Sequence, residues 1–119
     1  MRVRRVQDRV RRPLKDQQAV AHLLADMATR TEAARLLVYS AAAAIDSGAA
    51  GIAGRSAMAK LFATEAAQFV VDAAVQIHGA RALQRGHLLE HLYREVRAPR
   101  IYECASEIQR TIIARQLFK

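Results

Sequence analysis

The sequence predicts an all-α fold, an up-and-down helical bundle, from three observations. Apolar residues recur near the helical period of 3.6 over two long stretches. The alternation of period 2 that marks half-buried strands is absent from the sequence, and clusters of β-branched residues are few. The chain has 119 residues, 52% of them hydrophobic, which is enough for one domain with its own core.

The first half of the sequence predicts two long helices. One runs from about Pro13 to Ser47, because proline is tolerated in a first helical turn, and its apolar face carries Val20, Leu23, Leu24, Met27, Ala34, Leu37, Val38, Ala41 and Ile45. Three glycines then break the pattern, Gly48, Gly51 and Gly54. The second helix runs from about Arg55 to His78, and Gly79 suits the position just after its end. The aromatic residues expected in the core are Tyr39, Phe62, Phe69 and Tyr93.

The last third predicts two shorter helices. The first spans about Leu88 to Val96 and ends before Pro99, since the residue before a proline disfavours helical geometry. The second runs from Ser106 to Leu117. Ser106 and Gln109 fit a capping box, with serine at the N-cap and glutamine three residues on. A carboxylate held in the loop before such a helix is a candidate general base, although most such residues are simply solvated.

The charge is unevenly distributed. The net charge is +8, and residues 1–16 contribute +5 through seven Lys or Arg and two Asp. We therefore divide the chain into a basic N-terminal arm, residues 1–12, and a bundle, residues 13–119. A basic arm can bind nucleic acid or an anionic surface. This one contains no aromatic residue for base stacking, so a solvated segment is the preferred interpretation and nucleic acid is not expected as a partner.

The single cysteine and the lack of long apolar runs indicate the compartment. Cys104 excludes an internal disulfide and fits a reducing environment, and its small apolar side chain is expected to be buried. No apolar run of transmembrane length and no secretory signal occur in the sequence. A cytoplasmic location without a membrane partner is expected.

Four blocks of the sequence, in order, resemble the C-terminal helical domain of the FAD-dependent acyl-CoA dehydrogenases. The resemblance extends over roughly residues 12–118, and the blocks are 18–27 (QAVAHLLADM), 58–67 (MAKLFATEAA), 74–82 (AVQIHGARA) and 100–110 (RIYECASEIQR). The resemblance implies FAD-dependent α,β-dehydrogenation of an acyl-CoA. Full members also have an N-terminal helical domain and a middle β-domain, for which this sequence has no counterpart. We therefore expect the 119-residue chain to be inactive by itself.

The resemblance also implies site residues. Glu103 matches the catalytic base that removes the α-proton of the acyl-CoA, while its backbone N–H helps to polarise the thioester carbonyl. Gln76 and Gly79 match a loop that contacts the flavin ADP of a neighbouring subunit, although a plain helix end explains them equally well. Ala105 and Gln109 are further expected cofactor contacts.

Several positions depart from the family pattern. Cys104, Ala80 and Ala82 stand where the family has glycine, Gln7 where it has a flavin-contacting arginine, and Val10–Arg11 where it has Phe-Gly. These changes keep an alternative open, a non-catalytic helical oligomerisation module derived from the family. A dimer or tetramer is expected in either case, because the alanine-rich helices fill little volume, and a partner chain that supplies the missing domains is a further possibility. Acyl chain length and electron acceptor stay open.

Two remaining patterns receive structural interpretations. His87, Glu90 and His91 spell the H-x-x-E-H pattern of some zinc proteases, but no third ligand is evident downstream, so no metal is predicted. Arginines recur every third residue at positions 94, 97 and 100. On a helix they form a basic ridge, which we expect to pair with Glu90, Glu95 or Glu107 rather than with CoA phosphates.

Overall fold

The computed structural model describes residues 13–118; the predicted basic arm lies outside the described residues. Within this range the chain is helical and contains no strand, which confirms the all-α prediction. The elements in order are η1 (Leu14–Asp16), α2 (Gln18–Asp46), α3 (Ile52–His78), η2 (Gly79–Leu83), α4 (Leu88–Glu95), η3 (Ala98–Arg100) and α5 (Ser106–Leu117).

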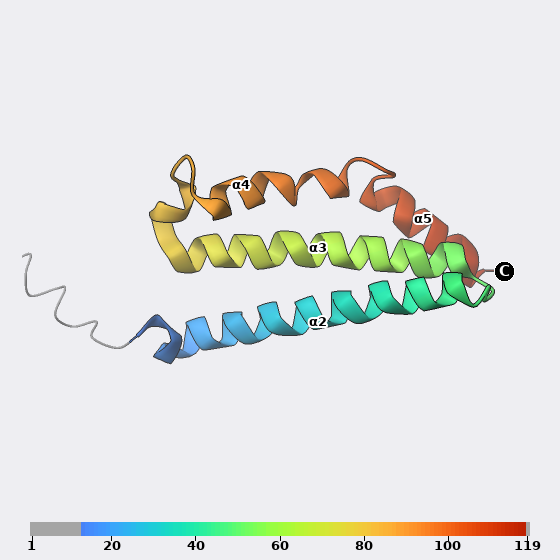
Figure 1. Ribbon diagram of the computed structural model, residues 1–119, viewed down its shortest axis with the longest axis horizontal. Helices are drawn as coiled ribbons and strands as arrows, with labels where there is room; N and C mark the ends of the chain where they lie inside the picture. The colour runs from blue at the N-terminus through green and yellow to red at the C-terminus, as the bar shows by residue number, and fades with distance from the viewer. Residues whose placement is uncertain (1–12, 119) are drawn as a thin grey trace, which may run out of the picture.

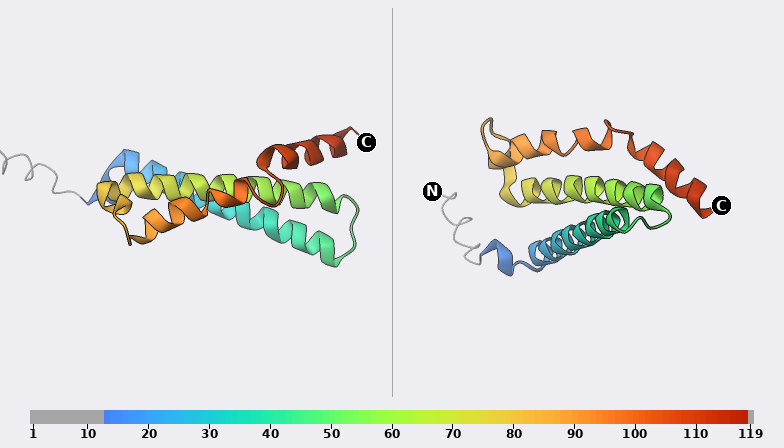
Figure 2. Two further views of the ribbon diagram at one scale, coloured as in Figure 1. Left: turned by 90° about the horizontal axis from the view of Figure 1, so that it is seen from above. Right: turned by 45° about the vertical axis from the view of Figure 1, so that its right-hand side comes forward.

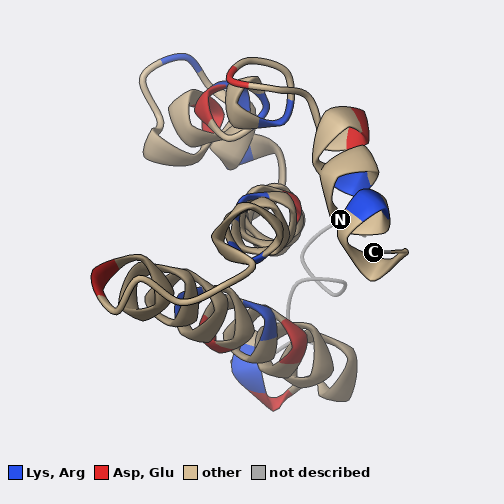
Figure 3. Ribbon diagram, turned by 90° about the vertical axis from the view of Figure 1, so that its right-hand side faces the viewer, with Lys and Arg blue, Asp and Glu red and all other residues tan. Residues whose placement is uncertain are grey.

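Helix α3 is the centre of the bundle. It runs antiparallel to α2, which packs along most of its length, and α4 and α5 pack against its other sides (Figure 1). Viewed end-on, α3 is surrounded on three sides, with α4 and α5 following one another along the molecule (Figures 2 and 3). The prediction of an up-and-down bundle is therefore confirmed. The two helices that follow α3 in the chain, α4 and α5, both pack against it.

The turn between α2 and α3 uses two of the three predicted glycines. Gly48 and Gly51 have positive φ angles of 64° and 79°, which glycine adopts without steric cost. The prediction that Gly54 belongs to the break is wrong, because α3 already begins at Ile52. Gly54 is buried inside α3, and a Cβ there would overlap the side-chain oxygen of Gln116 on α5. It thus permits close contact between the two helices.

The first long helix begins later than predicted. Gln17 is extended, with φ −80° and ψ 120°, so α2 begins at Gln18, and only the short turn η1 follows Pro13. Residues 13–19 are all exposed. Because this segment buries no side chain, packing does not favour extension of the helix to Pro13, and proline's tolerance of a first helical turn is not enough by itself.

The core consists almost entirely of small side chains. Its buried hydrophobic residues are Ala41, Ala44, Ala57, Ala59, Ala66, Val71, Ala73 and Ala82. The prediction that Tyr39 and Tyr93 are core residues is wrong, since they are 64% and 40% exposed. Small residues let the helices approach closely and leave no space between them for large rings. Phe62 and Phe69 are half-buried, and the Arg30 guanidinium lies 4.2 Å from the centre of the Phe69 ring.

Candidate functional site

The loop between η3 and α5 is anchored to the middle of α3 by one lysine. Lys60 Nζ donates hydrogen bonds to the carbonyl oxygens of Tyr102 (2.9 Å), Glu103 and Cys104 (2.6 Å). Lys60 is half-buried and lies about two turns after the start of α3. Three consecutive carbonyl groups of the loop therefore point at a single ammonium group.

The anchored loop has an unusual backbone. Glu103 and Cys104 both have positive φ angles, 52° and 72°, and they are the only non-glycine residues with positive φ in the described part of the chain. This conformation costs about 1–2 kcal/mol for a residue with a Cβ. The prediction that Cys104 is buried is wrong: it is exposed, because the carbonyl groups of this loop, and not its side chains, face α3.

The same geometry directs the loop's N–H groups away from α3. In a trans peptide the N–H points opposite to the preceding carbonyl, and the described residues contain no cis peptide. The N–H groups of Glu103, Cys104 and Ala105 therefore point away from Lys60. None of them donates to a backbone carbonyl in residues 13–118. They have no backbone acceptor among the described residues and lie just before the N-terminus of α5, and because the three carbonyls converge on Lys60 the N–H groups point in diverging directions.

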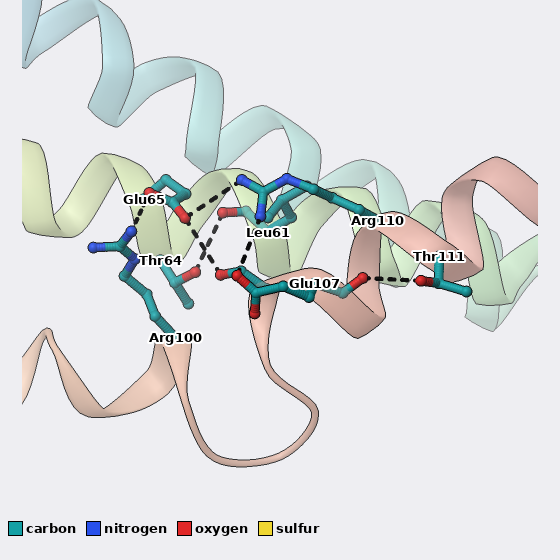
Figure 4. Close-up of polar contacts among 8 residues, drawn as sticks. Leu61, Thr64, Glu65, Arg100, Glu107, Arg110 and Thr111 are labelled. Atoms are coloured by element: carbon teal, nitrogen blue, oxygen red, sulfur yellow. Dashed lines mark hydrogen bonds and ion pairs between the residues drawn. The ribbon is translucent and has the colours of Figure 1, made fainter.

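Both ends of the loop are tied to a second residue of α3. Glu65 accepts a hydrogen bond from Ser106 Oγ at 3.3 Å, and its carboxylate lies 2.9 Å from Arg100 Nη2 and 3.8 Å from Arg110 Nη2 (Figure 4). Arg100 precedes the loop, whereas Ser106 and Arg110 follow it. The Glu65 side chain is 33% exposed, so water screens these pairs only in part.

The predicted capping box is wrong. Ala105 is the N-cap of α5, and no side chain caps the helix. Ser106, the first helical residue, donates its hydroxyl to Glu65 instead. Gln109 is buried, and its Nε2 donates to the Cys104 carbonyl at 3.2 Å. Both side chains that the pattern assigned to a local cap therefore hold the loop through more distant contacts.

Glu103 itself is exposed, and its carboxylate forms no ion pair with another described residue. Lys60 holds the carbonyl group of Glu103 and those of its two neighbours, Tyr102 and Cys104. The Glu103 side chain is left free to contact a ligand. An unpaired carboxylate on a fixed loop, next to an unpaired N–H donor of the same residue, can exchange a proton with a ligand whose oxygen that donor binds.

The other predicted cofactor contacts lie at a different place. Gln76 is exposed near the end of α3, and Gly79 follows it with φ 66°. Along the helix, Gln76 lies about 16 Å from Glu65, at 1.5 Å per residue. A Cβ at Gly79 would meet nothing within 4 Å. Ala82, in the turn that follows Gly79, is fully buried, so its methyl group belongs to the core.

His87 has a local structural role. Its Nδ1 accepts a hydrogen bond from the Leu89 N–H at 3.1 Å and so caps α4, and its ring lies 6.0 Å from that of His78. Residues 13–118 contain no group of three potential metal ligands. The cap gives His87 a structural role at the start of α4.

The arginine ridge is paired in part as predicted. Arg94 lies 2.6 Å from Glu90, which confirms that pair. Arg100 pairs with Glu65, which the sequence did not suggest as its partner. The described part of the chain shows no ion pair at 4.0 Å or less for Arg97, which lines a cavity of about 440 Å³ with Arg100, Arg110 and Glu65.

Sequence reasoning missed Lys60 and Glu65 as residues of the site. Both lie in the block 58–67, one of the four that carry the family resemblance. A signal was available for Glu65, since a charged residue there interrupts the apolar helix face of Leu61, Phe62 and Phe69.

Comparison with known proteins decides the family. The model of the family described as acyl-CoA dehydrogenase, C-terminal domain, matches residues 2–118. The chain belongs to this family. It is 41% identical to the acryloyl-CoA reductase (NADH) of Anaerotignum propionicum over 98% of the chain and 30% of that relative. Its fold matches butyryl-CoA dehydrogenase from Megasphaera elsdenii with a TM-score of 0.88 and 32% identity, over 92% of the chain and 28% of that structure.

A further match is a structure described as the FAD complex of PigA, with a TM-score of 0.85 and 29% identity over 92% of the chain and 29% of that structure. The chain thus spans less than a third of the length of the relatives it matches. No helix among residues 13–118 is long and apolar enough to cross a membrane.

Proposed function

We propose that this chain is the helical C-terminal part of an FAD-dependent oxidoreductase that introduces an α,β double bond into an acyl-CoA. The observation that supports this most is the Glu103 loop, with its free carboxylate and an unpaired N–H donor of the same residue. Family membership supports the reaction type.

In this proposal the loop performs two tasks. The Glu103 carboxylate removes the α-proton of the thioester, and in the reverse direction the protonated residue returns it. The thioester carbonyl oxygen accepts a hydrogen bond from the Glu103 N–H, where negative charge develops as the proton leaves. FAD, when bound, takes the hydride from the β-carbon. The α-proton and the β-hydride together account for the two hydrogens removed.

The candidate FAD contacts fit a dinucleotide that two copies of the chain share. Ala105 and Gln109 lie beside the Glu103 loop, whereas Gln76 and Gly79 lie at the far end of α3. The open space around Gly79 leaves room for a ligand. A dimer or tetramer would bring one chain's loop near another chain's Gln76, so we propose a homo-oligomer, with the remaining walls of the site supplied outside the four matched blocks. We also propose a cytoplasmic setting, which the exposed Cys104 thiol favours.

The test uses the purified 119-residue chain. Its absorbance spectrum and its mass in solution are measured with and without added FAD, followed by a turnover assay with an acyl-CoA and an artificial electron acceptor. We expect an oligomer that does not turn over by itself. Sustained acceptor reduction by the isolated chain would contradict the proposed inactivity. A saturable flavin band that Gln76→Ala, an exposed change within α3, weakens would support the FAD contact.

The alternative is a non-catalytic helical oligomerisation module. Cys104 favours it, because a residue with a Cβ occupies a positive-φ position where the family has glycine. Tight FAD binding by the oligomer would contradict this alternative, and a colourless oligomer that FAD does not alter would favour it.

A further inference from the structure

We propose that Lys60 is the positioning residue of the Glu103 loop. Its ammonium group turns three consecutive peptide planes, so that their carbonyls face α3 and their N–H groups point away from it. The inference deepens the proposed function and rests on it as far as the reaction is concerned. The orientation of the loop is a separate, structural claim.

The donor capacity of Lys60 matches this role. An ammonium group has three protons, and three carbonyl oxygens, those of Tyr102, Glu103 and Cys104, accept from it. Lys60 forms no ion pair with Glu103 or any other described carboxylate. The lysine therefore holds the backbone around the base and leaves the carboxylate available for proton transfer.

Apart from one hydrogen bond from Gln109, no other hydrogen bond among the described residues reaches these three carbonyl groups. Glu65 ties Arg100, Ser106 and Arg110, which flank the loop. Gln109 reaches only the Cys104 carbonyl. Positive φ at Glu103 and Cys104 is disfavoured, and it persists only where the surroundings impose it. Without the ammonium group, the three converging carbonyl dipoles repel one another, and the peptide planes would rotate. This rotation would turn the Glu103 N–H away from the position in which it can bind the thioester carbonyl.

Nuclear magnetic resonance on the full chain tests the orientation directly. Positive φ gives a strong nuclear Overhauser effect between a residue's own amide and Hα protons. We expect it for Glu103 and Cys104 in the unmodified chain and in the control Lys15→Met, an exposed lysine of η1. We expect its loss in Lys60→Met, whose side chain has similar length and helix propensity, with the signals of α3 and α5 retained.

A second variant separates positioning from general stability. In Lys60→Met with Cys104→Gly, we expect the Glu103 effect to return in part, because glycine adopts positive φ without the lysine. An unchanged Glu103 signal in Lys60→Met overturns the proposal. If Lys60→Met loses helical structure, the unmodified chain gives the test. Absence of nuclear Overhauser effects between the Lys60 ε-methylene protons and the backbone protons of residues 102–104 would then overturn the proposal.

Turnover tests the catalytic consequence. It is measured on the assembled protein, which here means the chain combined with the domains that it lacks and loaded with flavin. We expect Lys60→Met to lower kcat about tenfold to a hundredfold, with partial recovery in the Cys104→Gly background, because misplacement of a catalytic group by an ångström costs rate of this order. If the loop signals depend on Lys60 but no turnover exists, the proposed function fails and the positioning role stands. If the protein turns over but neither the loop signals nor kcat depends on Lys60, the proposed function stands and the positioning role of Lys60 fails.

Discussion

Cys104 adopts a backbone conformation that its own side chain disfavours. Its φ of 72° is typical of glycine. The side chain is exposed, so its removal opens no cavity. We predict that Cys104→Gly stabilises the chain by about 1 kcal/mol, since relief of steric strain exceeds the entropy that glycine adds to the unfolded chain.

Urea denaturation at equal protein concentration measures this change. Cys104→Ala is the matched control, because alanine also lacks the thiol but keeps the Cβ. It should leave the free energy of unfolding within about 0.5 kcal/mol of the unmodified chain. Equal stabilisation by both variants would assign the effect to the thiol and contradict the strain.

Glu103 offers the second prediction at the residue scale. Glu103→Gln keeps the size of the side chain and removes the base, so kcat of the assembled protein should fall by about 10²-fold or more. The loop conformation should not change, because the carboxylate forms no ion pair in the described structure. Glu107→Gln, on an 81% exposed side chain four residues along, is the control. Equal losses of kcat in both variants would argue against Glu103 as the base.

At the scale of elements, Glu65 connects α3 to η3 and α5 at once. Glu65→Gln keeps a hydrogen-bond acceptor for Ser106 and removes the charge that Arg100 and Arg110 share. We predict a loss of about 1 kcal/mol in the free energy of unfolding at low salt, and a smaller loss at high salt, because salt screens partly exposed pairs.

Glu32→Gln is the matched control for this prediction. The pair between Glu32 and Arg35 joins residues of one helix, and both side chains are more than half exposed. Its removal should cost about 0.3 kcal/mol. Similar losses from the two substitutions would show that Glu65 has no special role between the elements.

The elements also show which sequence signals were reliable. The end of α3 at His78, the start of α4 at Leu88 and the span of α5 agree with the prediction, because apolar periodicity and terminal glycine act locally. The capping box failed, since the carboxylate of Glu65, 41 residues away, takes the Ser106 hydroxyl. A spacing rule within one helix contains no information about such a partner.

The candidate site was predictable to a similar extent. The position of Glu103 in a loop before a helix followed from the sequence, and the family resemblance supplied its proposed role. The three bonds from Lys60 and the positive φ angles did not follow, because they depend on how the loop packs against a helix more than 40 residues earlier. Side-chain exposure failed for the same reason at Tyr39 and Tyr93.

At the scale of the whole molecule, the isolated chain leaves a large apolar surface uncovered. Among the described residues no large side chain is fully buried, and α2 carries Leu36 at 59% and Tyr39 at 64% exposure. These two residues are three apart and share one helix face. At 100° per residue, the middle of that face lies about 140° around the helix from the middle of the face that buries Ala41 and Ala44. We expect this outer face of α2 to contact another copy of the chain in the proposed homo-oligomer.

We predict that Leu36→Glu weakens self-association of the chain. A buried leucine contributes about 1.5–3 kcal/mol, so its replacement by a charge should raise the dissociation constant about tenfold or more. Gln18→Glu, which adds the same charge at the start of the same helix, should leave association unchanged. Sedimentation analysis over a range of protein concentrations measures both variants. An unchanged dissociation constant in Leu36→Glu would mean that another surface joins the subunits. The C-terminal end of α3, which carries Gln76, would then be the next surface to test.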